Sequence, residues 1–398
     1  MTLALPGVTA VMVENESAEV LARATRVLIA GGGTGGHVFP MLAVGQALHR
    51  VAPNASVVFV GTARGLEARA IPAAGEALEL LDVAPLRGGG LRGFVRGGFK
   101  AVRSLVSARA LVQRVRPDVV LSVGGYAGGP VALAARLMGV PLAFLEPNSV
   151  LGLTNKLLAP FAARAYFAFG DLDKRARAGV AARFGVPLRG SFTPSKYSAV
   201  AARMRVVLLG GSQGARALNE SMPAAVRALL DRAPFASIVH QAGRGQAEAT
   251  RARYEAAGVP LSSSSSTTEL APGHAHVSEF IDDVATELDR ADLVVQRCGA
   301  SSLAELCAVG RASVLVPFPF AADQHQLANA KSLEAEGAAI AMEQSAATPE
   351  RLGSVLTELA LDPARRQEMA DRARALGKPS AAEDVARDLC ALAHRGRP

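Results

Sequence analysis

The chain has no tryptophan, four tyrosines and three cysteines among 398 residues. Cys298, Cys307 and Cys390 lie far apart without the close spacing of a zinc site, so free thiols in a reducing compartment are expected. Aromatic residues make up 5% of the chain, too few for the stacking surfaces that bind single-stranded nucleic acid, and no nucleic-acid partner is expected. No Asp-x-Asp metal signature follows a strand, so the sequence predicts neither a metal nor another cofactor.

Targeting and membrane-spanning segments are also missing from the pattern. Residues 1–25 carry three glutamates and no basic start, which is atypical of a signal peptide, and they are interpreted as an extension before the first strand. The most apolar region, 127–145, is interrupted by Arg136, Pro130 and Pro141. This favours a buried helix, turn and strand over a membrane span.

The net charge of +8 has a local origin. Segment 87–116 contains no acidic residue and alternates basic with apolar side chains; its basic residues are Arg87, Arg92, Arg96, Lys100, Arg103, Arg109, Arg114 and Arg116. Such a segment can lie on an anionic membrane surface, and we expect Arg87–Arg116 to do so. The alternative is an ordinary solvated helix face.

Short apolar strands alternate with helical segments along the chain, which predicts parallel sheets covered on both faces. The same strand, glycine loop and helix occur twice, about half the chain apart, so we expect two Rossmann-like domains facing across a cleft. The predicted parts are an extension (1–25), a first domain (26–188), a second domain (189–370) and a C-terminal helix packing back on the first domain (371–398).

The first glycine loop follows the strand expected at 26–30 and fits G-x-G-x-x-G at Gly31, Gly33 and Gly36. A dinucleotide site would also need an acid at the tip of the second strand, but strand 56–61 is followed by Thr62. NAD binding is therefore not expected. The loop carries Thr34 and His37, and His37 is a candidate proton acceptor or a packing residue.

The second glycine loop, Gly210–Gly214, follows the strand expected at 205–209. It has no Lys-Ser/Thr pair and is not an ATP-type phosphate loop. Its N–H groups, Ser212 and the helix that follows suit a diphosphate, whereas the structural alternative is a tight strand–helix turn.

Two further segments suit a sugar nucleotide. Glu305 lies one turn into a helix after a glycine, where a carboxylate can accept hydrogen bonds from both ribose hydroxyls; taken alone it would be a surface acid. Asp323, Gln324, His325 and Gln326 follow a strand, at the sheet edge where open α/β folds bind ligands.

Together these segments resemble the MurG family, the peptidoglycan N-acetylglucosaminyltransferases, over nearly the whole chain after Arg26. The matching segments are G-G-G-T-G-G-H-V-F-P, S-V-G-G-Y-A-G-G-P, G-L-T-N-K, G-V-P-L-R, G-G-S-Q-G-A-R-A-L-N, E-F-I-D-D and residues 298–338. The resemblance implies a GT-B fold and inverting transfer of N-acetylglucosamine from UDP-N-acetylglucosamine to the muramoyl 4-hydroxyl of undecaprenyl-linked lipid I, giving lipid II. It also implies a peripheral enzyme on the cytoplasmic face of the bacterial inner membrane, with cell-wall synthesis proteins as partners.

The resemblance further assigns roles to residues. His37 is implied as the catalytic base, and Thr34, Gly36 and Tyr126 lie near the acceptor, whose pyrophosphate would be the anion facing the first loop. Ile281 is implied for the uracil, Glu305 for the ribose, and Arg189 and Ser212 for the diphosphate. The other residues implied on the donor side are Thr34, Gly35, Gly36, Asn148, Gln213, Gly214, His325 and Gln326.

The chain departs from the family where His-Glu-Gln-Asn is usual and Leu145-Glu146-Pro147-Asn148 stands here, and at His325, where glutamine is common. Three alternatives remain: a glycosyltransferase for another acceptor, a UDP-sugar epimerase, and a non-catalytic scaffold for cell-wall assembly.

Overall fold

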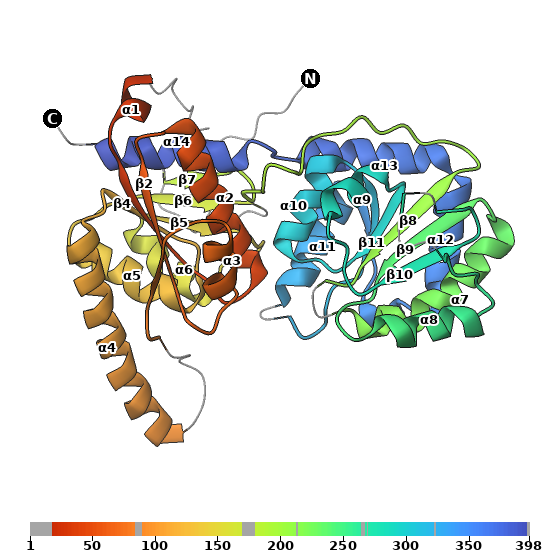
Figure 1. Ribbon diagram of the computed structural model, residues 1–398, viewed down its shortest axis with the longest axis horizontal. Helices are drawn as coiled ribbons and strands as arrows, with labels where there is room; N and C mark the ends of the chain where they lie inside the picture. The colour runs from red at the N-terminus through yellow and green to blue at the C-terminus, as the bar shows by residue number, and fades with distance from the viewer. Residues whose placement is uncertain are drawn as a thin grey trace. The chain divides into compact units, whose positions relative to one another are not determined.

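The computed structural model describes residues 18–83, 90–168, 180–211, 214–263, 267–268, 270–321 and 324–395, without the side chains of 90–101. The chain divides into two compact units. Unit 1 comprises Met1–Gly190 and Ser380–Pro398, and unit 2 comprises Ser191–Pro379 (Figure 1). The first domain was expected to end at residue 188, and unit 1 extends to Gly190. The C-terminal part was expected to begin at residue 371, but residue 371 lies within helix α13 (Pro363–Leu376) of unit 2, and the chain returns to unit 1 at Ser380.

Unit 1 contains a parallel sheet of seven strands in the order β3-β2-β1-β4-β5-β6-β7. The strands are β1 (Arg26–Ala30), β2 (Ser56–Gly61), β3 (Leu78–Leu80), β4 (Val119–Ser122), β5 (Leu142–Glu146), β6 (Arg164–Phe167) and β7 (Ala181–Ala182). In β1, Val27 and Ile29 enter one core cluster while Leu28 and Ala30 enter another, because alternate side chains point to opposite faces. Both faces of this sheet are therefore buried.

Helices cover both faces of this sheet. They are α1 (Ala18–Ala22), α2 (Gly35–Val51), α3 (Glu67–Ala73), α4 (Gly90–Val115), α5 (Gly125–Leu137), α6 (Leu153–Leu158), the short 3-10 helix η1 (Ala159–Phe161) and α14 (Ala381–His394). Helices α2 and α14 share the core cluster of one face, and α4 and α5 share that of the other. Helix α14 is anchored by Asp388, whose carboxylate accepts hydrogen bonds from Arg164 Nε at 3.0 Å and Tyr166 Oη at 2.8 Å.

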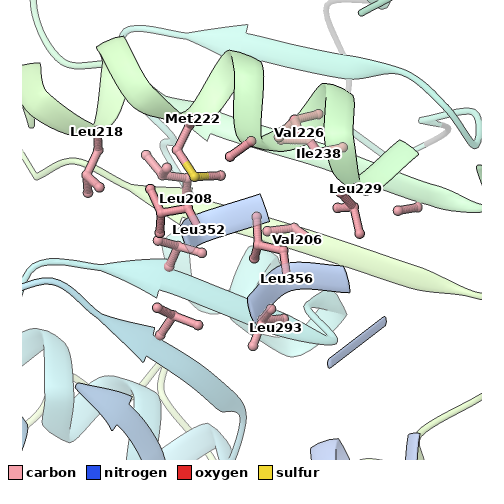
Figure 2. Close-up of a cluster of buried hydrophobic side chains, with 14 of the residues drawn as sticks. Val206, Leu208, Leu218, Met222, Val226, Leu229, Ile238, Leu293, Leu352 and Leu356 are labelled. Atoms are coloured by element: carbon pink, nitrogen blue, oxygen red, sulfur yellow. The ribbon is translucent and has the colours of Figure 1, made fainter. Parts of the chain in front are cut away.

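Unit 2 contains a parallel sheet of six strands in the order β10-β9-β8-β11-β12-β13. The strands are β8 (Met204–Leu209), β9 (Ala236–Gln241), β10 (Ala275–Ser278), β11 (Leu293–Gln296), β12 (Ala312–Leu315) and β13 (Ala339–Ala341). The helices are α7 (Arg216–Arg232), α8 (Ala247–Ala256), α9 (Val284–Arg290), α10 (Ala300–Val309), α11 (His325–Ala335), η4 (Gln344–Ala346), α12 (Pro349–Leu361) and α13 (Pro363–Leu376). Val206 and Leu208 of β8 pack with Met222 of α7 and Leu352 of α12 (Figure 2).

The two sheets repeat the strand order expected of Rossmann-like domains, so the predicted fold class is confirmed. Helices α2 and α5, which begin at Gly35 and Gly125, each contain a proline. Pro40 and Pro130 are each the sixth residue of their helix, so each removes one intrahelical hydrogen bond, to the carbonyl of Gly36 or of Tyr126. No helix among the described residues is both long and apolar enough to cross a bilayer.

Candidate functional site

The strand order of unit 1 reverses between β1 and β4, and open α/β sheets bind ligands outside the carboxyl ends of strands at such a point. The loops after β1 and β4 touch there. A Cβ on Gly125 would lie 2.4 Å from the carbonyl oxygen of Gly32, and Gly125 has a φ of +74°. Glycine is thus required for the contact that joins the first glycine loop to the start of α5.

His37 lies in the first turn of α2 and is half-buried. A Cβ on Gly124 would be 3.6 Å from its Nε2 and 3.7 Å from Asn155 Nδ2. His37, the loop after β4 and α6 therefore converge on Gly124. Thr34 before the helix is exposed and Gly35 and Gly36 are half-buried, so this turn of α2 is accessible to a ligand.

Glu146, at the end of β5, connects Asn148 to this group. Its Oε1 accepts hydrogen bonds from the backbone N–H and side-chain amide of Asn148, at 3.1 and 3.2 Å. Its Oε2 accepts from Gly152 N at 2.8 Å and Asn155 Nδ2 at 3.0 Å. Glu146 is buried, so the loop from 146 to 155 is organised around one carboxylate. The family departures at Leu145 and Pro147 are buried positions that leave these bonds intact.

Tyr126 and Arg189 lie in the same unit. Tyr126 follows Gly125 in α5 and is 53% exposed, which suits a ligand contact. The guanidinium of Arg189 lies 4.9 Å from the centre of the Phe39 ring, an arrangement typical of a cation–π contact. Arg189 is thereby held beside α2, at Phe39, which is two residues after His37 in the sequence.

The first glycine loop is bound by an acidic residue that the sequence interpretation missed. Glu67, the first residue of α3, accepts a hydrogen bond from Gly33 N at 2.8 Å through Oε2. Its Oε1 accepts from the backbone N–H and hydroxyl of Thr62, at 2.9 and 2.8 Å. One N–H of the loop expected to face the acceptor pyrophosphate, that of Gly33, is therefore already bound within the chain. The sequence signal that could have revealed this contact was an acidic residue, Glu67, six residues after the end of β2 rather than directly at its tip.

In unit 2 the strand order reverses between β8 and β11. The second glycine loop follows β8; Ser212 and Gln213 lie outside the described residues. Gly214 has a φ of +73°, and a Cβ on it would lie 2.2 Å from Ala242 O and 2.5 Å from Gln246 Nε2. The loop is thus packed against the segment that follows β9, immediately before α7.

A buried polar network supports that contact. Asn219 Nδ2 donates to Ala242 O and Gln246 Oε1, both at 2.9 Å. Asn219 Oδ1 lies 2.9 Å from His240 Nε2, and His240 Nδ1 lies 3.0 Å from Tyr254 Oη. Burial lowers the pKa of His240 to about 3 and raises that of Tyr254, so both side chains are neutral at physiological pH. The network fixes the loop without a charge of its own.

The remaining predicted donor residues lie at the carboxyl edge of the same sheet. Ile281 follows β10 in a half-buried position, and Glu305 is a half-buried residue of α10, the helix after β11. His325 is the first residue of α11, after β12. Since these helices and loops follow neighbouring strands, the structure brings the four predicted segments to one edge of the sheet.

Gln326 has a structural task in addition to any ligand contact. Its Oε1 accepts hydrogen bonds from Cys298 N at 3.2 Å and Phe318 N at 2.9 Å. A carbonyl oxygen has two lone pairs, so both are engaged in joining the segments after β11 and β12. A sugar contact by Gln326 would then use its amide N–H groups. No cluster of possible metal ligands occurs in the described part of the chain.

Comparison with known proteins links this arrangement to sugar-nucleotide enzymes. Residues 27–167 match the model of the glycosyltransferase family 28 N-terminal domain, and residues 205–385 match that of the family 28 C-terminal domain. A protein of Sorangium cellulosum is 52% identical, covering 93% of this chain and 89% of the relative. A protein of Acidithiobacillus ferrooxidans is 42% identical over 91% of this chain and 96% of its own length. Both are named UDP-N-acetylglucosamine–N-acetylmuramyl-(pentapeptide) pyrophosphoryl-undecaprenol N-acetylglucosamine transferase.

Solved structures agree. The crystal structure of Acinetobacter baumannii MurG is 33% identical with a TM-score of 0.75, covering 92% of this chain and 99% of that chain. The calicheamicin glycosyltransferase CalG4 has a TM-score of 0.63 at 16% identity, and a UDP-N-acetylglucosamine 2-epimerase has 0.61 at 13%. These last two share the fold alone, although they represent two of the alternatives left open by the sequence.

Proposed function

The chain belongs to glycosyltransferase family 28, and we propose that it transfers N-acetylglucosamine from UDP-N-acetylglucosamine to the muramoyl 4-hydroxyl of undecaprenyl-linked lipid I, forming lipid II with inversion. The observation that carries this proposal is the 52% identity to a relative named for that reaction, over 93% of the chain. The candidate sites at the carboxyl edges of both sheets suit the two substrates.

Unit 2 is the proposed donor-binding unit. The backbone of the second glycine loop, with Ser212, Gln213 and Gly214, and the N-terminus of α7 bind the diphosphate, because free N–H groups and the helix dipole favour an anion. Ile281 meets the uracil through its backbone, and Glu305 accepts hydrogen bonds from the ribose hydroxyls. Asn148, His325 and Gln326 are the proposed sugar contacts, and Thr34, Gly35 and Gly36 are the further residues proposed for the donor.

Catalysis is assigned to unit 1. His37 accepts the proton of the 4-hydroxyl as that oxygen bonds to the anomeric carbon, while the bond from that carbon to the phosphate oxygen breaks and UDP leaves with the electron pair. Thr34, Gly36 and Tyr126 orient the acceptor. The α7 N-terminus and Arg189 stabilise the charge that develops on UDP.

A direct test is the release of UDP from UDP-N-acetylglucosamine with and without a lipid I analogue. We expect release only when the analogue is present, together with a disaccharide product seen by mass spectrometry. UDP release without acceptor would instead favour the epimerase, and no transfer at all would favour the non-catalytic scaffold.

The lipid acceptor also requires a membrane contact, and we assign it to an apolar patch on unit 1. The patch consists of exposed side chains on the outer sides of α4, α5 and α6 with η1: Val102, Val106, Leu133, Leu137, Leu153, Leu157 and Phe161. The inner sides of α4, α5 and α6 share one core cluster, and the outer sides also carry exposed Arg103, Arg109, Arg136 and Lys156. Helix α4 extends past the rest of its unit (Figure 1) and carries residues 90–115 of segment Arg87–Arg116. Apolar side chains among cations suit the cytoplasmic leaflet of the inner membrane, where cell-wall synthesis proteins would be partners.

Replacing Arg92, Arg96 and Lys100 together with glutamine should weaken binding to anionic vesicles by roughly a hundredfold, since each basic residue near such a surface contributes about 1 kcal/mol.

The double variant Leu137→Glu with Leu157→Glu should also weaken vesicle binding, because it places negative charge in the apolar patch. The matched control is Leu361→Glu, at a leucine of α12 in unit 2 that is 53% exposed. Vesicle sedimentation measures the affinity; full binding by the triple variant would disprove the docking role of α4.

A further inference from the structure

A side chain of the chain itself binds an N–H group of the first glycine loop. Glu67 is 0% exposed, and its carboxylate accepts hydrogen bonds from Gly33 N, Thr62 N and the Thr62 hydroxyl. Gly33 is the second glycine of G-x-G-x-x-G, the position where a dinucleotide fold admits the pyrophosphate. Glu67 therefore holds the place that a phosphate takes in that fold.

Three glycines make room for this carboxylate. A Cβ on Gly32, Gly61 or Gly65 would lie 2.3, 2.3 or 2.0 Å from an atom of the Glu67 side chain. These glycines come from the first loop, the end of β2 and the turn before α3. Glycine at these three positions is thus explained by an internal anion, whereas Gly33 has no atom within 4 Å of its Cβ position.

The carboxylate is also kept ionised. Burial alone would raise the pKa of Glu67, but hydrogen bonds from the backbone of Gly33 and Thr62, from its own N–H and from the Thr62 hydroxyl hold it below the usual value. At neutral pH a negative charge therefore lies beside the loop. It belongs to Glu67 at the N-terminus of α3, and it contacts Gly33, two residues before the start of α2. A second anion at the same N–H groups would meet electrostatic repulsion.

We propose that Glu67 is a positioning and selectivity residue: its carboxylate replaces a ligand phosphate at the Gly33 N–H, keeps phosphate groups from that N–H, and fixes the turn that presents Thr34 and His37. The kinetic part of this inference rests on the proposed glycosyl transfer. The anion-exclusion part rests on the loop geometry alone.

The experiment compares Glu67→Ala and Glu67→Gln with wild type and with Glu79→Gln, a control carboxylate on β3 that pairs with Arg114 at 2.9 Å. Equilibrium dialysis with inorganic pyrophosphate should find one more binding site in Glu67→Ala than in wild type. Because a small misplacement of the base is costly, kcat of both Glu67 variants should fall about tenfold or more while KM for UDP-N-acetylglucosamine stays near wild type. Added formate should restore part of kcat in Glu67→Ala only.

Acid stability gives an independent readout. A depressed native pKa contributes stability above the unfolded pKa of about 4.3, and this stability is lost as pH falls through the native pKa. Glu67→Gln should lack that part of the acid dependence, whereas Glu79→Gln should retain it. If Glu67→Ala does not fold, Glu67→Gln provides the test. Its amide N–H groups would face the Gly33 N–H and could not accept the hydrogen bond that the carboxylate accepts.

Wild-type kcat in both variants, with no additional pyrophosphate site, would overturn the inference. If wild type itself releases no UDP with a lipid I analogue, the proposed function fails. The pyrophosphate count and the acid dependence still decide the role of Glu67 in that case.

Discussion

His37→Ala is expected to lower kcat by about a hundredfold or more, the usual contribution of a general base, while affinity for UDP-N-acetylglucosamine stays near wild type. His37 lies in the first turn of α2 in unit 1, whereas the residues proposed for uracil, ribose and diphosphate lie in unit 2. Removing the imidazole should therefore affect the transition state more than donor binding. UDP release with a lipid I analogue measures kcat, and calorimetry with the donor measures affinity.

The same helix offers a control. His49, near the C-terminus of α2, is exposed at the surface, and its Nε2 lies 3.1 Å from Glu76 Oε2. His49→Ala removes an imidazole from the same element, away from the first turn, and should leave kcat within about twofold, as expected of a surface substitution. Equal kcat values for the His37 and His49 variants would remove His37 from the mechanism.

The sequence predicted the strands that form the centre of each sheet. Residues 26–30 and 56–61 were expected as strands and are β1 and β2, because four- to six-residue apolar runs are typical of parallel strands buried on both faces. The strands β6, β7 and β13 were not expected. They are short, and β7 has two residues, so hydrophobic periodicity gives little signal there.

The candidate site was predictable where a single motif contains both the site residue and the strand, loop and helix that position it. His37, Glu305 and Gly214 each belong to a local strand, loop and helix, so their positions at the sheet edges followed from the sequence. The partners of Glu67 and Gln326 did not follow. Glu67 binds Gly33, 34 residues earlier, and Gln326 binds Cys298, 28 residues earlier, and only the folded sheet brings such pairs together.

The second glycine loop illustrates the same limit. Its glycines suggested close approach of a ligand, and Gly211, with a φ of +76° and no atom near its Cβ position, is consistent with that. Gly210 and Gly214 instead face the protein, since a Cβ on Gly210 would lie 2.8 Å from Gln241 O. Two of the glycines are thus required by packing against the end of β9, which sets the path of the loop.

Gly214→Ala should consequently weaken UDP binding by at least about tenfold, equivalent to about 1.4 kcal/mol. The added methyl would lie 2.2 Å from Ala242 O, which Asn219 holds through a 2.9 Å hydrogen bond, so the backbone of the loop must move. That movement displaces the N–H groups proposed to bind the diphosphate, just before α7. Titration calorimetry with UDP measures the loss.

Gly245→Ala separates this clash from simple backbone strain. Gly245 also has a positive φ, +68°, but no atom lies within 4 Å of its Cβ position. Its substitution should cost about 1–2 kcal/mol of stability for the left-handed conformation and leave UDP affinity near wild type. If both variants bind UDP equally well, the packing of Gly214 against Ala242 does not position the diphosphate loop. A loss confined to Gly214→Ala would mean that the buried Asn219 network, reaching the loop through Ala242, controls donor affinity without touching the donor.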